Sequence, residues 1–441
     1  MENREFGQET DGYLPESEIT KKIEAMVKRS RNHPSIILWS LCNEAGCLQR
    51  SPEQAVRKGN AAKAAIHALD HTRPMTAAIN FGSKGSDCEW DCLTPTLEIV
   101  GMNYNWDDWD AFHANNTNQP MVSSEMTRSN SVRSVYAPTL PRTDPITDKG
   151  YSTVFQAAPG YVNTWHQINS RREWLAGGFL WTGMDYLGEP NSQYSISSSF
   201  GAVDIAGFSK DSAYFFKANW TAGPRVHIVE DWRARAEGTE VVVWVFSNNE
   251  VDTVQLHLNG AAVGEAQPVT DNYLVKVNVS FAAGELKATG YAKDGKTVVA
   301  SDSHQTATAA VGMNLTVDFN ADDLRADGAD VFMARVAVVD KSGRLVPDAG
   351  SQYNITFSVS QTNSVDAVSQ PPAIFGVANG DPSPWVMVDG APVYQKDKAS
   401  WRAPFAGLAR VIVQSGTLPG AVVLTATAKG LGSATVSVLS H

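Results

Sequence analysis

The apolar positions in the first half of the chain alternate between helical spacing and short unbroken runs. In residues 16–31 they recur at the three- and four-residue intervals of an amphipathic helix. The apolar residues of this helix are Ile19, Ile23, Met26 and Val27. Pro34 ends the helix, because proline disfavours helix in the residue before it. The run that follows, residues 35–41, is almost entirely apolar, which is typical of a buried strand in a parallel sheet.

The same alternation continues to about residue 225. The expected helices cover residues 52–69 and 161–175, and the expected strands cover residues 75–80, 97–104, 121–125 and 178–182. Strands that alternate with helices form a parallel sheet, which is either doubly wound or closed into a β/α barrel.

After residue 225 the pattern becomes that of an all-β protein. Short strands are separated by turns such as Asn259-Gly260 and Lys293-Asp294-Gly295, a spacing that favours β-sandwiches. We therefore predict three domains. They are a β/α domain over residues 1–225 and two immunoglobulin-like sandwiches over residues 226–308 and 309–441.

Charge and composition narrow the classes of partner. The chain has 36 Lys and Arg against 47 Asp and Glu, a net charge of −11, which disfavours nucleic acid and anionic membrane surfaces. A neutral sugar is compatible with this charge, and the 12 Trp and 12 Tyr include rings that can stack on pyranose faces. No apolar stretch approaches the roughly 20 residues of a membrane span, and the first residues lack a signal-peptide pattern. We expect a soluble chain and favour the cytoplasm.

Two acidic residues come directly after apolar strands. The strand at residues 35–41 leads into Asn43 and Glu44, and the strand at residues 121–125 ends in Glu125. In β/α barrels the functional side chains lie at the C-terminal ends of the strands. Two carboxylates about 5–5.5 Å apart at such a place would act as nucleophile and acid/base in a double displacement with retention. The alternative for Glu44 is a helix-capping acid.

Polar and aromatic residues also gather at neighbouring strand ends. Asn103 and Tyr104 follow the strand before Glu125, and Trp181 ends the last predicted strand. A tyrosine hydroxyl can hydrogen-bond a nucleophilic carboxylate, and a tryptophan can form the floor of a sugar site. The alternative for the rings is core packing.

The chain has four cysteines, which are too few for a disulfide framework. Cys47 follows the strand that leads to Glu44, while Cys88 and Cys92 lie in the loop after the next strand. Three thiolates with one further ligand would bind zinc tetrahedrally. The alternatives are free thiols or one loop disulfide. Cys42 lies within its strand, and we expect it in the core.

Several segments resemble glycoside hydrolase family 2. Residues 31–44, RNHPSIILWSLCNE, closely resemble its acid/base signature, and Ser124-Glu125 with Arg133 and Tyr136 resembles the nucleophile segment of its β-galactosidases. Further segments that resemble the family, in the same order, are residues 177–190, 200–211, 326–328 and 376–382. The resemblance implies a multidomain protein with an incomplete TIM-type β/α barrel, strands four to eight, followed by two immunoglobulin-like sandwiches.

The resemblance also implies a retaining exo-β-galactosidase that releases terminal non-reducing β-D-galactose through a covalent glycosyl-enzyme. Glu44 would be the acid/base and Glu125 the nucleophile. The implied substrate-binding residues are Asn43, at the sugar 2-hydroxyl, Tyr104, beside the nucleophile, and Asn103 and Trp181. The chemistry needs no cofactor, although some β-galactosidases of the family use magnesium near the acid/base.

Other functional interpretations of the sequence remain open. A β-glucuronidase or β-mannosidase would use the same scaffold, but we find no Asn-x-Lys segment, typical of glucuronidases, after Glu125. The spacing of Arg133 and Tyr136 favours a galactosidase. A reading from another class is a non-catalytic sugar-binding or complementing fragment.

The resemblance starts just before the fourth barrel strand, so the family's earlier strands and domains have no counterpart in this sequence. A half-barrel would have two open edges with unpaired backbone groups. We therefore expect the chain to form a dimer or higher homo-oligomer, or to bind a second chain that covers these edges. Light scattering at micromolar concentration checks this expectation, and a monodisperse monomer would contradict it.

Overall fold

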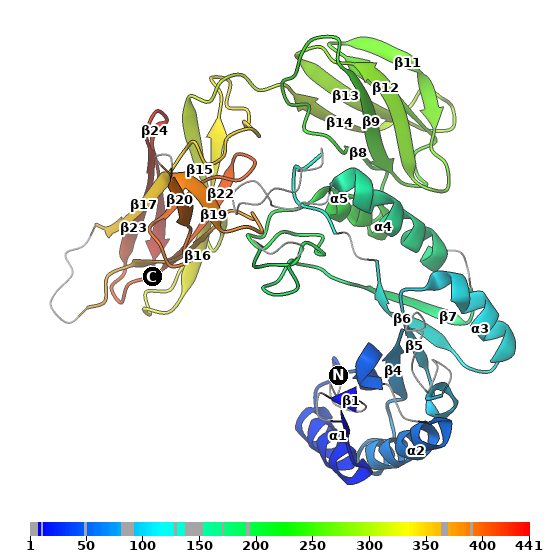
Figure 1. Cartoon of the computed structure of the whole chain (residues 1–441). Coiled ribbons are helices and arrows are strands. Elements are labelled where there is room, and N and C mark those ends of the chain that lie inside the picture. Colours follow the sequence, from blue (N-terminus) through cyan, green and yellow to red (C-terminus); the bar gives the residue numbers. More distant parts are fainter. Residues whose placement is uncertain are drawn as a thin grey trace. The chain divides into compact units, whose positions relative to one another are not determined.

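The structure is a computed structural model that describes residues 8–9, 12–47, 51–80, 92–127, 130–136, 153–169, 172–190, 195–362, 369–388 and 391–441. The chain forms two compact units. The first contains residues 1–128 and 163–181, and the second contains residues 129–162 and 182–441. Figure 1 shows the first unit mainly in blue and cyan and the β-rich remainder in green to red.

The first unit is built on a sheet of five strands, all parallel, in the order β3-β4-β5-β6-β7. Because all five strands are parallel, their C-terminal ends lie at the same edge of the sheet. Their bounds are β3 (Trp39–Asn43), β4 (Met75–Ile79), β5 (Val100–Asn103), β6 (Met121–Met126) and β7 (Leu175–Leu180). The β/α arrangement predicted from the apolar pattern is confirmed.

The first strand begins later than the apolar run predicts. Residues 35–38 precede β3, since the chain turns after Pro34 with Ile36 N donating to the carbonyl of His33. Ile37 is 65% exposed. Trp39 N donates to the carbonyl of Pro74, and pairing with β4 starts there. The apolar residues before Trp39 thus lead into the sheet without joining it.

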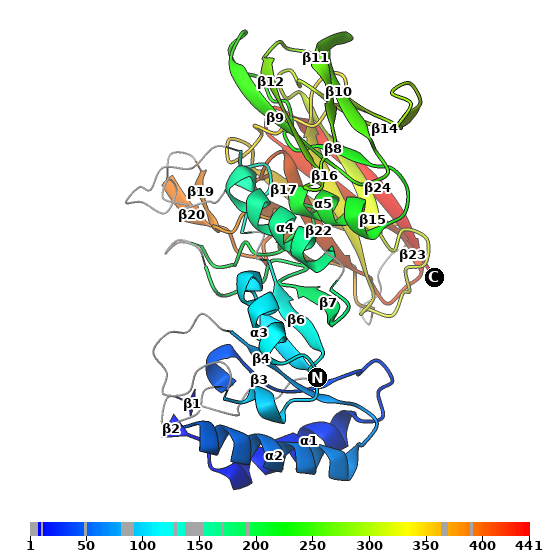
Figure 2. The same ribbon diagram turned by 90° about the vertical axis from the view of Figure 1, so that its right-hand side faces the viewer.

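Two helices, α1 (Glu16–Ser30) and α2 (Pro52–Leu69), lie side by side and share a core with the strands (Figures 1 and 2). The four apolar positions predicted for α1 are all buried. The helix α2 starts where Ser51 caps it, with Ser51 Oγ accepting from Gln54 N at 3.3 Å. The remaining elements are β1 (Gln8–Glu9), β2 (Gly12–Tyr13), η1 (Glu44–Cys47), η2 (Thr94–Thr96), η3 (Trp106–Asp108), α3 (Trp109–Asn115) and α4 (Val154–Asn169).

The second unit contains a buried ion pair near the start of α5 (Asp211–Trp220). Lys210 Nζ donates to Asp185 Oδ1 at 2.8 Å and to the carbonyl oxygens of Ser131 and Ser199. Both charged side chains are at most 1% exposed. Burial raises the pKa of Asp185 to about 6, although Lys210 opposes the rise. Loss of either partner would leave a buried charge uncompensated.

The rest of this unit consists of two β-sandwiches. The first packs sheets β12-β9-β8 and β11-β10-β13-β14 around one apolar core. Its strands are β8 (Val226–Ile228), β9 (Glu240–Ser247), β10 (Thr253–Leu258), β11 (Ala261–Pro268), β12 (Leu274–Ser280), β13 (Glu285–Tyr291) and β14 (Val298–Gln305).

The second sandwich packs sheets β15-β16-β22-β18 and β21-β17-β23-β24 around another core and carries the hairpin β19-β20. Its strands are β15 (Gly312–Phe319), β16 (Val331–Val339), β17 (Ile355–Gln361), β18 (Ala373–Ala378), β19 (Trp385–Val388), β20 (Ala391–Tyr394), β21 (Trp401–Arg402), β22 (Leu408–Gln414), β23 (Gly420–Ala428) and β24 (Gly432–Ser440). The predicted fold class, part of a parallel β/α barrel followed by antiparallel sandwiches, is confirmed. Within the described ranges, no helix is long and apolar enough to cross a membrane.

A largely buried histidine, whose side chain is 14% exposed, links α5 to the first sandwich within the second unit. His227, on β8, contacts Asp211 Oδ1 through Nε2 at 3.0 Å and Asp302 Oδ2 through Nδ1 at 3.4 Å. Its ring stacks on Tyr214 and lies edge-on to His304. Burial lowers the pKa of His227, but the hydrogen bonds and charges of the two aspartates outweigh burial and raise the pKa above 6.5.

The raised pKa predicts a pH-dependent stability. The folded state binds the proton of His227 more tightly than the unfolded chain, so this stabilisation is complete below pH 6.5 and is lost as pH rises through the folded-state pKa. We expect the free energy of unfolding to fall above pH 6.5 by at most ~1.4 kcal/mol per pH unit from this group. Urea titrations from pH 5.5 to 9 of the native chain and of His227→Gln measure it.

His227→Gln should lack this part of the dependence of the free energy of unfolding on pH. His441→Gln, an exposed histidine in the same unit, is the matched control and should keep the slope. Equal slopes in the native chain and His227→Gln would contradict the assignment to His227.

Candidate active site

Glu44 follows β3 directly, where the backbone leaves regular strand geometry. The register of β3 against β4 shifts between Ser40 and Asn43. An extra residue of this kind bends a strand and redirects its side chains. Glu44 has φ +45°, a left-handed conformation that costs a non-glycine residue roughly 1–2 kcal/mol. Such a conformation persists only where the surroundings hold it, and it occurs often at functional sites.

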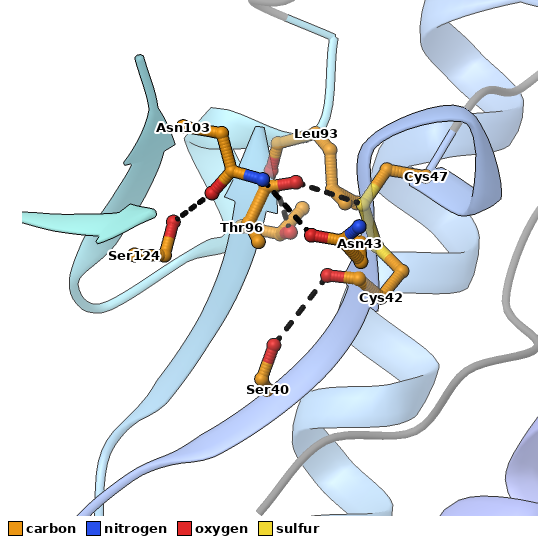
Figure 3. The surroundings of a disulfide bond; sticks show 9 residues. Ser40, Cys42, Asn43, Cys47, Leu93, Thr96, Asn103 and Ser124 are labelled. Atoms are coloured by element: carbon orange, nitrogen blue, oxygen red, sulfur yellow. Dashed lines mark hydrogen bonds between the residues drawn. A yellow bond between two sulfur atoms is a disulfide. The ribbon is translucent and has the colours of Figure 1, made fainter. Parts of the chain in front are cut away.

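The carboxylate of Glu44 is held by two side-chain amides. Its Oε1 accepts from Asn80 Nδ2 at 3.1 Å and from Asn103 Nδ2 at 3.0 Å. The same Asn103 amide donates to Asn43 Oδ1 at 2.9 Å, and its Oδ1 accepts from Ser124 Oγ at 2.7 Å (Figure 3). Strand ends from β3, β4, β5 and β6 are therefore joined by one network of neutral donors.

Glu125 lies near the end of β6, where a second shift in register occurs. Met102 on β5 pairs with Ser123, but Asn103 pairs with Glu125, so Ser124 is the additional residue. Tyr104 Oη donates to Glu125 Oε2 at 2.9 Å. Tyr104 itself is left-handed with φ +53°, and its carbonyl accepts from the indole of Trp109 at 3.0 Å. The tyrosine is thus anchored while its hydroxyl holds the carboxylate.

The structure brings the predicted site residues to one edge of the sheet. β4 and β5 lie between the strands that lead to Glu44 and Glu125, so both carboxylates are at the C-terminal edge. Trp181 follows β7, and its backbone N donates to the carbonyl of Met126 at 2.9 Å, beside the strand of Glu125. Two partly exposed carboxylates at such an edge are the groups that double displacement requires.

The prediction of a zinc site is wrong for Cys47. Its sulfur is bonded to that of Cys42, so it has no thiolate to offer a metal. Cys92 is also in a disulfide, and Cys88 lies outside the described residues. Cys42 is fully buried, as expected, but it is a disulfide partner as well as a core residue. Among the described residues, no three His, Cys, Asp or Glu side chains form a group that could hold a metal ion.

The sequence interpretation missed three members of the network. Asn80 follows β4 as Glu44 follows β3, and this shared position is the signal that would have found it. Asn105 Nδ2 donates to Asn80 Oδ1 at 2.7 Å and so supports the amide that holds Glu44. In the sequence, Ser124 is distinguished only as the residue before Glu125. Its role depends on the register shift, which the sequence pattern does not reveal.

Arg133 and Tyr136, whose spacing favoured a galactosidase, have structural contacts in the second unit. Arg133 Nε donates to Asp204 Oδ2 at 2.7 Å, and the two side chains are 7% and 0% exposed. Tyr136 packs against Phe155, and its ring lies under the guanidinium of Arg233. Burial raises the pKa of Tyr136 well above 10. These contacts account for both residues without a sugar.

Models of known families match most of the chain. The model described as the TIM barrel domain of glycosyl hydrolases family 2 matches residues 2–202, and the model described as C-terminal domain 5 of glycoside hydrolase family 2 matches residues 315–437. Residues 238–299, in the first sandwich, match a domain of unknown function.

Curated relatives carry two kinds of name. The chain is 28% identical to beta-galactosidase BoGH2A of Bacteroides ovatus over 95% of this chain and 51% of the relative. It is 27% identical to a putative beta-glucuronidase of Formosa agariphila over 74% of this chain and 32% of the relative. The chain therefore spans about half of the first relative and about a third of the second.

Solved structures share the fold. A family 2 glycosyl hydrolase of Bacteroides cellulosilyticus superposes with a TM-score of 0.76 at 22% identity, covering 100% of this chain and 55% of that chain. A beta-glucuronidase from glycoside hydrolase family 2 superposes with a TM-score of 0.74 at 22% identity, covering 100% of this chain and 42% of that chain. The fold is thus shared with these structures, and the two family 2 models, which together match residues 2–202 and 315–437, show that the chain belongs to glycoside hydrolase family 2 and contains a C-terminal part of the TIM barrel and C-terminal domains of that family.

Proposed function

We propose that this chain carries the catalytic carboxylates of a retaining exo-β-galactosidase, with Glu125 as the nucleophile and Glu44 as the acid/base. The observation that supports the proposal is that both carboxylates lie at one edge of a parallel sheet and are held differently. Tyr104 holds one oxygen of Glu125, and two amides hold one oxygen of Glu44.

In the first step, Glu125 Oε1 attacks the anomeric carbon while Glu44 transfers a proton to the departing oxygen. The bond between the sugar and its leaving group breaks as the bond to Glu125 forms, which gives a covalent glycosyl-enzyme. Tyr104 orients Glu125 through Oε2, and the attack comes from Oε1. The proton that Glu44 transfers would leave from Oε2, since Oε1 accepts the amide N–H groups of Asn80 and Asn103.

In the second step, Glu44 acts as a base. It removes a proton from water, the water oxygen attacks the anomeric carbon, and Glu125 leaves as a carboxylate. Two inversions give a product of the original configuration. Asn43 lies beside this reaction and would bind the sugar 2-hydroxyl, a contact that strengthens in the transition state. Asn103 and Trp181 would line the sugar site.

Galactose is the sugar we favour. The Bacteroides ovatus relative, which aligns with 95% of this chain, is named a beta-galactosidase. The donors that bond the two carboxylates are neutral amides and a phenol, which suit hydroxyl groups. The second candidate is a β-glucuronidase, because the Formosa agariphila relative and several others carry that name. A β-mannosidase would share the mechanism.

If this chain by itself does not hydrolyse a galactoside, its function belongs to a different class. It would then bind a sugar, or complement a second polypeptide or another copy of itself that completes the barrel around the sheet. A magnesium ion near Glu44 would also depend on such a second polypeptide or copy. Its further ligands would come from residues outside the described parts of this chain.

We place the protein in an oxidising compartment. The sequence favoured the cytoplasm, where disulfides are rare and thiols are kept reduced. The structure has Cys42 and Cys47 in one disulfide and Cys92 in another, and none of the cysteines in the described parts of the chain is free. This pairing favours the periplasm or the exterior of a cell.

Two alanine variants distinguish the roles of the carboxylates. We expect Glu125→Ala and Glu44→Ala each to lower kcat/KM for phenyl β-galactoside by about 10³-fold or more. With 2,4-dinitrophenyl β-galactoside, whose leaving group needs no proton, azide should raise the turnover of both variants, with different products. In Glu125→Ala it replaces the nucleophile and gives the α-galactosyl azide, whereas in Glu44→Ala it attacks the glycosyl-enzyme and gives the β-galactosyl azide. NMR of the products measures the configuration.

The control is Glu173→Ala, an exposed glutamate of the same unit, which should keep native activity. Azide products of the opposite configurations would exchange the two roles. Absence of turnover in the native chain would shift the proposal to a binding or complementing fragment.

A panel of 4-nitrophenyl β-glycosides tests the sugar. We expect the kcat/KM for the galactoside to exceed those for the glucuronide and the mannoside by about tenfold or more, or 1.4 kcal/mol in transition-state binding. The physical reason is that a site built from hydroxyl-binding donors leaves them unpaired when the hydroxyl pattern changes. A glucuronide hydrolysed faster than the galactoside would establish the second candidate.

A further inference from the structure

A disulfide closes the short segment that carries the proposed acid/base. It joins Cys42, the residue before the last one of β3, to Cys47, the last residue of η1. Their Cα atoms are 5.2 Å apart. Cys42 is fully buried and Cys47 is 8% exposed, and both belong to the core of the first unit. Figure 3 shows the bond beside Asn43. Residues 43–46 are thus fixed to the core at both ends.

The enclosed segment has a backbone that needs such a restraint. Glu44 has φ +45°, which a glutamate in an open chain leaves readily for the ordinary regions. A covalent link across a short loop removes many of the conformations that compete with this one. The restraint acts within one residue of Asn43, which lies in the same loop and accepts from Asn103.

The disulfide also seats η1 on the neighbouring strand. Cys47 Sγ lies 3.6 Å from the carbonyl oxygen of Ala78 on β4, two residues before Asn80. A disulfide sulfur has no proton, so this is a packing contact and not a donated hydrogen bond. Two separate thiols need more room than one bonded pair, and both sulfurs lie in the buried core. Separation would therefore push η1 away from β4, and with it the bond between Asn80 and Glu44.

We infer that the Cys42–Cys47 disulfide is a positioning element for Glu44, which holds its carboxyl group where it protonates the departing oxygen. The inference rests on the proposed function, in which Glu44 is the acid/base. The two cysteines touch neither the sugar nor the reacting atoms and act through Glu44 alone. The enzyme consequently reaches its full rate only after oxidation, in keeping with the proposed compartment.

The leaving group provides a test that general destabilisation does not mimic. A 2,4-dinitrophenolate departs without a proton, whereas a phenolate or an alkoxide needs one from Glu44. In Cys42→Ala/Cys47→Ala we expect kcat/KM for phenyl β-galactoside to fall about tenfold further than kcat/KM for 2,4-dinitrophenyl β-galactoside. An equal loss on both substrates, or no loss, would overturn the inference.

The matched control is Ile23→Val, which lightens the same core from α1 without touching the loop. It should change both substrates by the same factor. If the double variant does not fold, the native chain is treated with dithiothreitol. The dithiol is oxidised to its cyclic disulfide, and the two protein sulfurs gain two electrons and two protons. Mass spectrometry after alkylation then follows thiols at positions 42 and 47 while the ratio of the two activities is measured, and a ratio that stays constant as these thiols appear overturns the inference.

A native chain that hydrolyses neither substrate would overturn the proposed function, and a second readout then decides the present inference. Hydrogen exchange of the peptide that spans residues 43–46 reports on the loop without turnover. Faster exchange in the double variant, or in the reduced chain, supports a disulfide that holds the loop. Unchanged exchange overturns it.

Discussion

The side-chain amide of Asn103 is the contact on which the arrangement of the candidate site depends. At the end of β5 and fully buried, it donates to Asn43, the last residue of β3, and to Glu44, which follows it, and it accepts from Ser124 on β6. The sheet alone brings these strand ends to one edge, but backbone pairing does not set side-chain directions. A planar amide with two donors and one acceptor does, because each of its bonds has a required direction. Asn103 therefore sets the side-chain directions at the ends of both strands that lead to the carboxylates, β3 and β6.

The backbone of the site is irregular at the points where the network needs it. Glu44, Tyr104 and Asn105 all have left-handed φ values, and the register shifts between β3 and β4 and again between β5 and β6. In a regular strand, neighbouring side chains point to opposite faces. The extra residue on β6 lets Ser124 and Glu125 both take part at the edge. The strain is sustained by a core that includes Trp109 and both cysteines of the first disulfide.

A residue's part in the site could be predicted from the sequence where that part depends only on the local pattern of apolar and polar positions. Glu44, Glu125 and Tyr104 could be predicted because each follows or ends an apolar run, and parallel strands bring such positions together. Ser124 could not, since its role depends on a one-residue register shift that no periodicity encodes. The Cys42–Cys47 pair was hidden for another reason. Cys42 lies in an apolar strand, where burial alone explains a cysteine, and its bond depends on the turn of η1.

Arg133 shows why resemblance identifies the family more readily than the sugar. It bonds Asp204 and the carbonyl oxygens of Asn379 and Phe405, so its donors serve packing within the second unit. Gly380 completes this contact, because a Cβ on it would meet Asp204 Oδ2 at 1.8 Å. Segments around residues 133, 204 and 380 must therefore change together to remain compatible, whichever sugar is bound. On the proposed function, differences in sugar preference should arise instead where side chains end the parallel strands, since Glu44 and Glu125 lie at that edge.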